Sequence, residues 1–325
     1  MPGGRRPAAK APQAVIPRAE RLLPPDLDSV VVDLDGKRVK LSNLQKPFWS
    51  ALGLSKGDLV RYYLTIAPTV LPHLRDRAMV MRRYPDGAEG ASFFMKRAPS
   101  SRPDWIETCT VTHASGTSIE YPMIQDLASL LWVVNLGCID LNQWYGRCDD
   151  PNRPDYMHFD LDPGAEASFA QVCETALVLH EALEGLRMSN YVKTTGSRGV
   201  HLYVPIARGP TQKDVWRIAR AIALEIVAHA GSLATAEYST AKRPPDRVLI
   251  DYNQNASGQT LASVYSVRPS ARAAVSMPVT WREIGRGIAI DDFRIDNAAQ
   301  RIRRRGDLWA PLLARAGRVR LSRFQ

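Results

Sequence analysis

The alternation of apolar and polar residues predicts short strands along much of the chain. Residues 29–42, SVVVDLDGKRVKLS, alternate on both sides of a turn, which is typical of a small β-hairpin. The other predicted strands cover 78–83, 92–96, 157–162, 200–206 and 248–252.

A period of three to four residues predicts the helices between these strands. Apolar residues recur at helical spacing over 166–186. A helix over 211–230 has the capping residue Thr211 before it and Asp214 three residues further on, and it ends at Gly231. Helices are also predicted over 56–70 and 126–136 and in the basic C-terminal segment. The order of strands and helices in the second half predicts an α/β sheet with helices packed on it.

Length and composition allow one large α/β domain or two lobes that share a cleft. The chain has 325 residues, of which 45% are hydrophobic, so it can bury a substantial core. Residues 1–28 are basic, are rich in proline and alanine and lack the apolar run of a secretory signal. We therefore expect a disordered arm over 1–28 and a folded part that begins near residue 29.

The charge balance favours a polyanionic partner. The net charge is +10 and the isoelectric point is about 9.6, which puts nucleic acid first among partners, although many basic proteins bind none. The four cysteines, Cys109, Cys138, Cys148 and Cys173, form no CxxC pair. Their spacing argues against a structural zinc site and against a disulfide framework, so we expect a reducing cytoplasm. No apolar run reaches the roughly 18 residues of a membrane span, so no membrane partner is expected.

Two carboxylates stand on one predicted strand, in MHFDLDPG. Alternation places Asp160 and Asp162 on the same face, about 7 Å apart at Cα. At that distance they can converge on a divalent cation and connect it to phosphate oxygens. The alternative is a solvated strand face that ends in a turn, and the DxD pattern alone does not decide between the two.

A third carboxylate favours the metal site. Asp251 lies in RVLIDY, where both faces of the predicted strand are largely apolar. A buried carboxylate is costly unless it is paired or binds a metal. Three aspartates on the strands of one sheet are the usual ligands of two Mg²⁺ or Mn²⁺ ions in phosphoryl transfer.

A glycine-containing loop follows in KTTGSRGVHLYVPI. Backbone N–H groups of the small residues over 195–199 can hold phosphate, and Lys193 and Arg198 add positive charge. His201 begins a strand whose other-facing residues are apolar. The alternative is an ordinary turn followed by an ordinary histidine. Together with the carboxylates, the loop predicts a triphosphate site.

Three motifs in this order, MHFDLDPG, KTTGSRGVHLYVP and VLIDYNQN…YSVR, resemble the polymerase domain of bacterial ligase D and its stand-alone relatives in the archaeo-eukaryotic primase superfamily. The resemblance runs from about residue 29 to the C-terminus. It implies a primase-polymerase fold of the α/β (α+β) class, with mixed central sheets, an RRM-like catalytic palm and flanking helices. It also implies an N-terminal lobe over about 29–125 and a catalytic lobe over about 126–325. The length leaves no room for a ligase or nuclease domain, so a stand-alone member is expected.

The resemblance also assigns residues to roles. The implied metal-binding and catalytic residues are Asp160, Asp162 and Asp251. The implied nucleotide-binding residues are Thr195, Ser197, Arg198, His201, Arg268 and Asn142. The implied DNA-binding residues are Lys46, Lys56, Arg82, Arg83, Phe93 and Phe94.

Within the DNA-binding set, each pair has its own implied task. Lys46 and Lys56 would hold a 5′-phosphate, the two phenylalanines would stack on the template and the two arginines would line the cleft. The alternatives are surface lysines and core phenylalanines. Because neighbouring strand residues point to opposite faces, at most one of the phenylalanines can be core.

The function implied is a template-dependent nucleotidyltransferase, a primase-polymerase that extends primers and fills short gaps in DNA repair. The resemblance implies two Mn²⁺ or Mg²⁺ ions, with Mn²⁺ preferred, and a preference for ribonucleotides. Its partners would be gapped or primed DNA with a 5′-phosphate, nucleoside triphosphates, and a separate DNA ligase or the end-binding protein Ku. It would act in the bacterial cytoplasm, at the nucleoid.

Three alternatives stay open at this point. The first is an end-joining polymerase that works with a ligase, which uses the same chemistry. The second is a Mn²⁺-dependent glycosyltransferase, since some of these enzymes also use a DxD motif. The third is a nucleic-acid-binding module without activity. The basic charge and the separate Asp251 weigh against the second, and the intact set of three aspartates weighs against the third.

Overall fold

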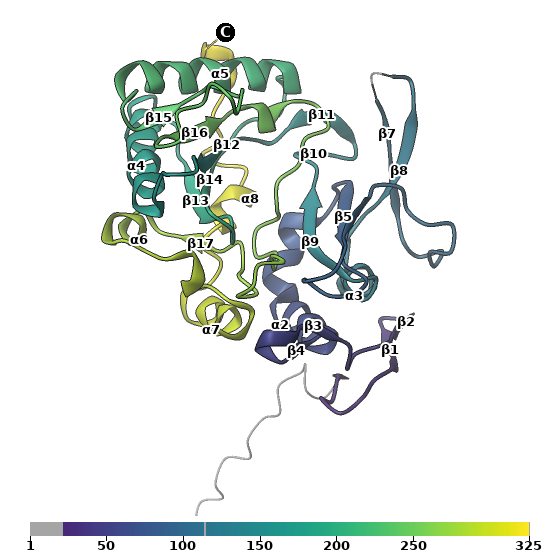
Figure 1. Ribbon diagram of the computed structural model, residues 1–325. Coiled ribbons are helices and arrows are strands. Elements are labelled where there is room, and N and C mark those ends of the chain that lie inside the picture. The colour runs from purple at the N-terminus through teal and green to yellow at the C-terminus, as the bar shows by residue number, and fades with distance from the viewer. Residues whose placement is uncertain (1–21, 114, 325) are drawn as a thin grey trace, which may run out of the picture.

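The computed structural model describes residues 22–113 and 115–324, and a six-stranded sheet forms the centre of its C-terminal part (Figure 1). The strand order is β15-β16-β12-β14-β13-β17. The bounds are β12 (Tyr156–Pro163), β13 (Tyr191–Thr194), β14 (Val200–Pro205), β15 (Ala234–Thr235), β16 (Val248–Asp251) and β17 (Pro278–Val279). β12 pairs antiparallel with β14 on one side and with β16 on the other, so the strand that carries MHFDLDPG is central.

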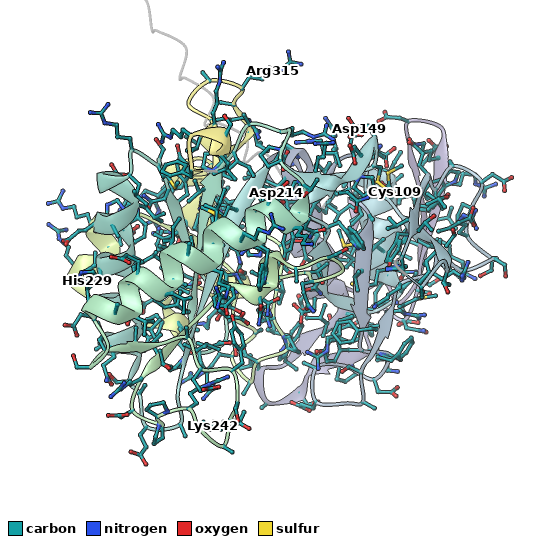
Figure 2. The ribbon with its side chains drawn as sticks, turned by 90° about the horizontal axis from the view of Figure 1, so that it is seen from above. Cys109, Asp149, Asp214, His229, Lys242 and Arg315 are labelled. Carbon is teal, nitrogen blue, oxygen red and sulfur yellow. A yellow bond between two sulfur atoms is a disulfide. The ribbon has the colours of Figure 1, made fainter. Side chains whose placement is uncertain are left out.

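Two long helices, α4 (Phe169–Gly185) and α5 (Gln212–His229), pack against β12 and against each other. In Figure 1 α5 runs across the top of the molecule and α4 lies at the side of the sheet. Figure 2 looks down on α5, with Asp214 near its beginning and His229 at its end. Both helices start with a capping box, in which Ser168 and Thr211 accept from a backbone N–H three residues on.

Apolar residues of β12 explain why the opposite face of this strand is free for chemistry. Met157, Phe159 and Leu161 have no exposed surface and belong to the main hydrophobic core. Because side chains alternate between the faces of a strand, the residues between them point the other way. The hydrophobic effect therefore fixes the register of β12, and the register fixes the direction of its carboxylates.

The N-terminal part contains a three-stranded antiparallel sheet in the order β6-β5-β9. Its strands are β5 (Met79–Arg83), β6 (Phe93–Met95) and β9 (Cys138–Gln143), and its helices are α2 (Lys56–Leu74) and α3 (Leu127–Asn135). Four antiparallel strand pairs complete the strands: β1 (Val30–Leu34) with β2 (Lys37–Leu41), β3 (Pro47–Trp49) with β4 (Leu54–Ser55), β7 (Thr108–Thr112) with β8 (Ser118–Pro122), and β10 (Gly146–Arg147) with β11 (Asp150–Pro154).

The remaining α-helices follow β17 in the chain and are short, apart from α7. They are α6 (Trp281–Arg286), α7 (Ile295–Arg305) and α8 (Ala310–Leu313), with single turns of 3₁₀-helix η1 (Ser50–Leu52), η2 (Asn253–Asn255), η3 (Ile290–Asp292) and η4 (Leu321–Phe324). α7 packs beside α2 in the lower part of Figure 1. No helix within residues 22–113 and 115–324 is long and apolar enough to cross a membrane.

Buried polar contacts join the two parts. Tyr62 on α2 donates to the backbone oxygen of Tyr265 at 2.9 Å, and the Trp49 indole donates to the oxygen of Ser270 at 2.9 Å. The Nη2 atom of Arg77 donates to both carboxylate oxygens of Asp155, at 2.7 and 2.8 Å, and both side chains are buried. These contacts attach α2 and the residues on both sides of it to the segments that precede and follow the large sheet's central strand.

The predicted strands and helices are all present, with ends that differ by a few residues. The largest difference is α2, which continues past the predicted end at residue 70 to Leu74 and contains Pro68 and Pro72. Asp160 and Asp162 lie near the C-terminal end of β12, which has antiparallel neighbours on both sides.

The predicted disordered arm over 1–28 was wrong for its last residues. Leu23 is fully buried in the main core, and the backbone oxygen of Asp28 accepts from the N–H of Leu44. Gln45 donates to the backbone oxygens of Pro25 and Leu27. The packed part of the chain therefore begins by residue 22, and the rest of the predicted arm, 1–21, lies outside the described residues.

The predicted boundary between lobes at about 125 separates elements that pack together. β9 follows this boundary in the chain, yet it pairs with β5 from the N-terminal part. α3 also follows it and packs against α2 and β2. A division at 125 would assign both elements to the other lobe.

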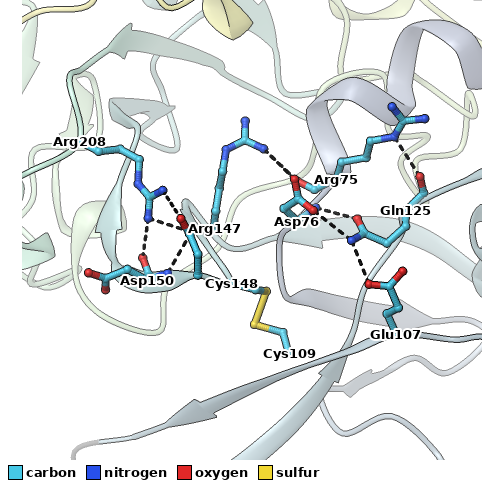
Figure 3. The surroundings of a disulfide bond; sticks show 10 residues. Arg75, Asp76, Glu107, Cys109, Gln125, Arg147, Cys148, Asp150 and Arg208 are labelled. Carbon is cyan, nitrogen blue, oxygen red and sulfur yellow. Dashed lines mark hydrogen bonds and ion pairs between the residues drawn. A yellow bond between two sulfur atoms is a disulfide. The ribbon is translucent and has the colours of Figure 1, made fainter.

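A disulfide contradicts the expectation drawn from the cysteine spacing. Cys109 on β7 is bonded to Cys148 in the turn between β10 and β11, with 5.7 Å between the Cα atoms (Figure 3). The two cysteines are 39 residues apart, so only the fold brings them together. Cys138 and Cys173 are free and buried.

Candidate active site

Four ionisable side chains stand in one row across four strands of the large sheet. In the register of β12, Asp160 is opposite Asp251 on β16 and opposite His201 on β14. His201 is in turn opposite Lys193 on β13. Directly opposed residues point to the same face of a sheet. The row Asp251–Asp160–His201–Lys193 therefore faces one side, which is the side that β12 leaves free of core residues.

The two aspartates of β12 have raised pKa values because they are buried close to like charges. Burial and then Asp251 raise the pKa of Asp160 to about 7. Asp160 and then burial raise the pKa of Asp162 to about 7, while Arg198 and Arg243 act in the opposite direction. Carboxylates held this close destabilise each other when both are ionised, and a bound cation would remove this repulsion.

Asp251 is tied more firmly to its surroundings. Its Oδ1 accepts from the Tyr238 hydroxyl at 2.9 Å and from the backbone N–H of Asn253 at 2.8 Å. Its Oδ2 accepts from the side chain of Gln254 at 3.0 Å. The position of Asp251 opposite Asp160 could not be predicted from the sequence, whereas the expected burial of Asp251 is confirmed.

The carboxylate oxygens of Asp160, Asp162 and Asp251 are suitable ligands for a divalent cation. The Oδ1 atom of Asp160 is buried and lacks a hydrogen bond, and hard cations prefer carboxylate oxygens. As the side chains stand, the part of the chain that the structure describes has no group of three or more His, Cys, Asp or Glu able to hold a metal ion together. Asp160 and Asp162 both line the cavity described below, whereas Asp251 does not. The three-ligand set stays a prediction.

The loop over 195–199 is held by the first of its side chains. The Thr195 hydroxyl accepts from the N–H groups of Ser197, at 3.0 Å, and Gly199, at 3.2 Å. Gly196 has a φ of +67°, which favours glycine. A Cβ on Gly199 would meet the backbone oxygen of Leu161 at 2.0 Å, so only glycine lets β14 start this close to β12. The loop thus sits directly beside the carboxylates.

His201 and Lys193 lie behind this loop. Both are buried, and the Lys193 Nζ atom is 2.7 Å from His201 Nδ1. His201 Nε2 is 3.2 Å from Asp160 Oδ1, and burial lowers the pKa of His201 well below its ordinary value. Lys193, which is expected to add positive charge beside the loop, is fully buried. Ser197 and Arg198 are the exposed residues of the loop.

Arg268 connects the loop to the small sheet. Its Nη1 atom donates to the backbone oxygen of Thr195 at 2.8 Å, and its Nε atom is 3.0 Å from Asp140 Oδ1. Asp140 is buried on β9, where burial raises its pKa and Arg268 and Arg82 oppose the shift. Asp140 is not among the site residues that the sequence motifs predict. Its charge within the apolar stretch CIDLNQW was the available signal.

Most of these side chains line one cavity of about 420 Å³. Of the predicted residues, it is lined by Arg82, Phe94, Asn142, Asp160, Asp162, Thr195, Ser197, His201 and Arg268. It is also lined by residues that no sequence motif indicated, namely Val80, Lys96, Asp140 and the segment 258–262. The cavity lies between the large sheet and the small sheet, and it carries acidic groups beside basic ones, as a site for a metal–phosphate group requires.

The aromatic pair on β6 is exposed. Phe93 and Phe94 have 47% and 60% of their surface exposed, so neither is a core residue. Each faces an arginine of β5 across the strands, with the Arg83 guanidinium 5.3 Å from the Phe93 ring and the Arg82 guanidinium 5.4 Å from the Phe94 ring. Phe94 and Arg82 line the cavity, whereas Phe93 and Arg83 do not.

Lys46 and Lys56 lie side by side but in different environments. The N–H of Lys56 donates to the backbone oxygen of Lys46 at 2.8 Å. Lys46 is half-exposed and pairs with Asp86 at 2.7 Å. Lys56 is buried, donates to the oxygen of Ser42, and burial followed by Lys46 lowers its pKa to about 8. Neither residue lines the cavity.

A mixed α/β fold with paired carboxylates and a glycine loop at one cavity is typical of nucleotidyltransferases. Residues 55–309 match the family described as "LigD, primase-polymerase domain". The chain belongs to this family, and it is therefore a nucleotidyltransferase of the polymerase class. Family membership decides against the glycosyltransferase alternative and implies metal-dependent catalysis.

The curated relatives are named for end joining. The chain is 34% identical over 282 residues to the multifunctional non-homologous end joining protein LigD of Mycolicibacterium smegmatis, which covers 86% of the chain and 37% of that protein. It is 30% identical over 298 residues to the LigD of Mycobacterium tuberculosis strain H37Rv, over 89% of the chain and 39% of that protein. The chain thus spans less than two-fifths of the length of these relatives.

A solved structure has the same fold. The polymerase domain of Mycobacterium tuberculosis ligase D, in complex with DNA, aligns with a TM-score of 0.81 and 29% sequence identity. The alignment covers 86% of this chain and 99% of that one. The primase-polymerase fold expected from the motifs is confirmed.

Proposed function

We propose that this chain extends primers and fills short gaps in DNA during end-joining repair, by transfer of nucleotides from nucleoside triphosphates. One observation carries the proposal. Asp160 and Asp162 face the same cavity as the loop of Thr195 and Ser197, and Arg268 connects that loop to the small sheet. The cavity therefore offers cation ligands and anion-binding groups within one space, as transfer of a nucleotidyl group requires.

Asp160 and Asp162 would hold divalent cations, Mn²⁺ or Mg²⁺, with Asp251 as the third ligand of a two-ion site. When bound, the cations lower the pKa of the primer 3′-hydroxyl and stabilise charge on the phosphates. Tyr238 and the N–H of Asn253 fix Asp251 from behind, so its approach to Asp160 is set before any ligand binds.

The triphosphate would lie against the loop and the basic residues. Arg268 is held by Asp140 and by the oxygen of Thr195, so its remaining donors keep a fixed direction. His201 and Ser197 would supply further donors in the cavity, Arg198 would supply one from the exposed part of the loop, and Asn142 lines the same wall. In an enclosed site, such fixed donors stabilise the negative charge of the leaving pyrophosphate more strongly than water does.

The nucleic acid would pass over β6 and the start of α2. Phe94 and Arg82 stand at the cavity and Phe93 and Arg83 beside it, which suits stacking of template bases and contact with phosphates. Lys46 and Lys56 would hold a 5′-phosphate on the far side of a gap. This part of the proposal requires Lys46 to exchange Asp86 for the phosphate.

The membership of the chain in the LigD primase-polymerase family supports more specific proposals about substrate, metal, location and partners. We propose a preference for ribonucleotides and for Mn²⁺, a place at the bacterial nucleoid, and a DNA ligase or Ku as partners. The relatives' names associate them with non-homologous end joining, which supports repair of broken ends over other uses of the same chemistry.

Extension of a primer on a gapped duplex tests the proposal. The substrate carries a 5′-phosphate or a 5′-hydroxyl at the gap, and ribonucleotides and deoxyribonucleotides are compared with Mn²⁺ and with Mg²⁺. We expect extension by the wild type, faster with ribonucleotides, and tighter binding of the phosphorylated gap. Glu225→Gln on exposed α5 is the matched control for Asp160→Asn, because each substitution removes one carboxylate charge. No extension by the wild type on any of these substrates would refute the proposal.

A further inference from the structure

Lys193 is a lysine with no exposed surface, and it has three partners. Its Nζ atom is 2.7 Å from His201 Nδ1, 3.0 Å from the backbone oxygen of Ala262 and 2.5 Å from the Ser276 hydroxyl. An ammonium group has three N–H donors and accepts nothing. The number of partners therefore equals the number of donors.

The direction of two of these hydrogen bonds follows from the partners alone. The carbonyl oxygen of Ala262 can only accept. The Ser276 hydroxyl donates its proton to the backbone oxygen of Thr194 at 2.9 Å, so its oxygen accepts from Lys193. Two of the Lys193 donors are thus assigned, and the third points at His201.

The third hydrogen bond fixes the protons of the imidazole ring. If Lys193 donates to Nδ1 of His201, this nitrogen carries no proton, and the neutral ring carries its proton on Nε2. Nε2 faces the cavity side, 3.2 Å from Asp160 Oδ1, which makes no hydrogen bond of good geometry there. The N–H on Nε2 is therefore available to a ligand in the cavity.

We propose that Lys193 is a positioning residue that holds His201 as its Nε2–H tautomer and so presents a fixed N–H donor to the triphosphate of the incoming nucleotide. This inference rests on the proposed function, because it takes the cavity as the triphosphate site. It assigns Lys193 a task without any contact with the nucleotide.

The other tautomer of His201, with its proton on Nδ1, is poorly suited to binding an anion. A neutral Lys193 amine could accept from an Nδ1–H of His201, and Nε2 would then present a lone pair to Asp160 and to the phosphates. Burial does lower the pKa of Lys193, as does Arg268, whereas Asp160 and Asp140 raise it. The contact of His201 Nε2 with Asp160 Oδ1 at 3.2 Å favours the ammonium form of Lys193, because an N–H on Nε2 faces the carboxylate oxygen favourably, whereas a lone pair there would be repelled by it.

The tautomer can be observed in the wild-type protein itself. The protein is labelled with ¹⁵N at histidine, and the imidazole signals are recorded without metal or nucleotide at neutral pH. The signals of His201 are assigned by their loss in His201→Gln. We expect an unprotonated Nδ1 and a protonated Nε2. An Nδ1–H tautomer or an imidazolium ring would overturn the inference.

The effect on the reaction is tested with Lys193→Met, which keeps the length of the side chain and removes the donors. We expect kcat/KM for the nucleotide to fall by roughly 10- to 100-fold, the usual loss when a residue that orients a ligand is removed. The affinity for gapped DNA should stay unchanged. In a His201→Gln background the same substitution should change kcat/KM by less than about twofold, because Lys193 acts through His201.

The outcomes separate this inference from the proposed function. Full additivity of Lys193→Met and His201→Gln, or wild-type kcat/KM in Lys193→Met, would overturn the role of Lys193. If the wild type does not extend gapped DNA at all, the proposed function fails, while the tautomer measured by NMR stands or falls independently. If Lys193→Met does not fold, the wild-type NMR measurement decides alone.

Discussion

Asp160 on β12 lies directly opposite Asp251 on β16, so two carboxylates face the same side of the sheet from neighbouring strands. The apolar residues of β12 fix its register, and that register directs the side chain of Asp160 to the face opposite the core. The fold therefore holds like charges together at the expense of its own stability. Such an arrangement is expected where the active protein binds a cation between the carboxylates.

The stability of the metal-free protein should reflect this repulsion. Burial and Asp251 raise the pKa of Asp160 to about 7, above its value in the unfolded chain. The folded state then binds more protons than the unfolded state at intermediate pH, so stability falls as the pH rises through this window. We expect Asp160→Asn to raise Tm at about pH 8 and to leave it nearly unchanged at about pH 4. Thermal unfolding with a chelator measures this, and an equal gain at both pH values would contradict it.

Residue 199, just before β14, should tolerate only glycine. A Cβ there would lie 2.0 Å from the oxygen of Leu161, so Gly199→Ala must move β14 away from β12. We expect a loss of about 1–3 kcal/mol or more in the free energy of unfolding. Gly185→Ala is the control, because a Cβ at this end of α4 meets nothing within 4 Å. Urea unfolding of the two variants checks this, and equal stabilities would rule out the close approach.

The buried pair of Arg77 and Asp155 should matter for stability in a pH-dependent way. Burial alone would raise the pKa of Asp155, but Arg77 and Arg147 hold it below its usual value. A lowered folded pKa gives stability that is present above the unfolded pKa and is lost as the pH falls through the folded one. We expect Arg77→Met to cost about 3–5 kcal/mol at neutral pH.

The same pair gives a second test at acid pH. The difference in the free energy of unfolding between the wild type and Arg77→Met should shrink below about pH 4, because Asp155 becomes protonated in the wild type as well. A difference that does not change between neutral and acid pH would show that Arg77 acts through packing alone.

The two exposed phenylalanines should differ in their importance. Phe94 lines the cavity and Phe93 does not. We expect Phe94→Ala to weaken binding of a gapped template by about 1–3 kcal/mol, the usual value of a base stacked on an aromatic ring. Phe93→Ala should have the smaller effect, and fluorescence anisotropy with labelled DNA compares the two. A larger loss in Phe93→Ala would reverse the assignment.

The sequence predicted the features that depend on local patterns. Alternation in MHFDLDPG placed Asp160 and Asp162 on one face, and the capping residue Thr211 gave the start of α5. The burial of Lys193 and of Asp140 was out of reach, because it depends on strands that lie far apart in the chain. The same is true of the disulfide, whose cysteines are 39 residues apart, and of Leu23, which packs into the core from a basic segment rich in proline and alanine.

The most direct test of the account is primer extension on a gapped duplex by Asp160→Asn, beside the wild type and Glu225→Gln, with Mn²⁺ and ribonucleotides. The carboxylate of Asp160 is a proposed cation ligand, whereas Glu225 lies exposed on α5. We expect Glu225→Gln to extend at the wild-type rate and Asp160→Asn to lose at least about 100-fold in kcat, as expected when a group that stabilises the transition state electrostatically is removed. Extension by Asp160→Asn at the wild-type rate would contradict the assignment of this site.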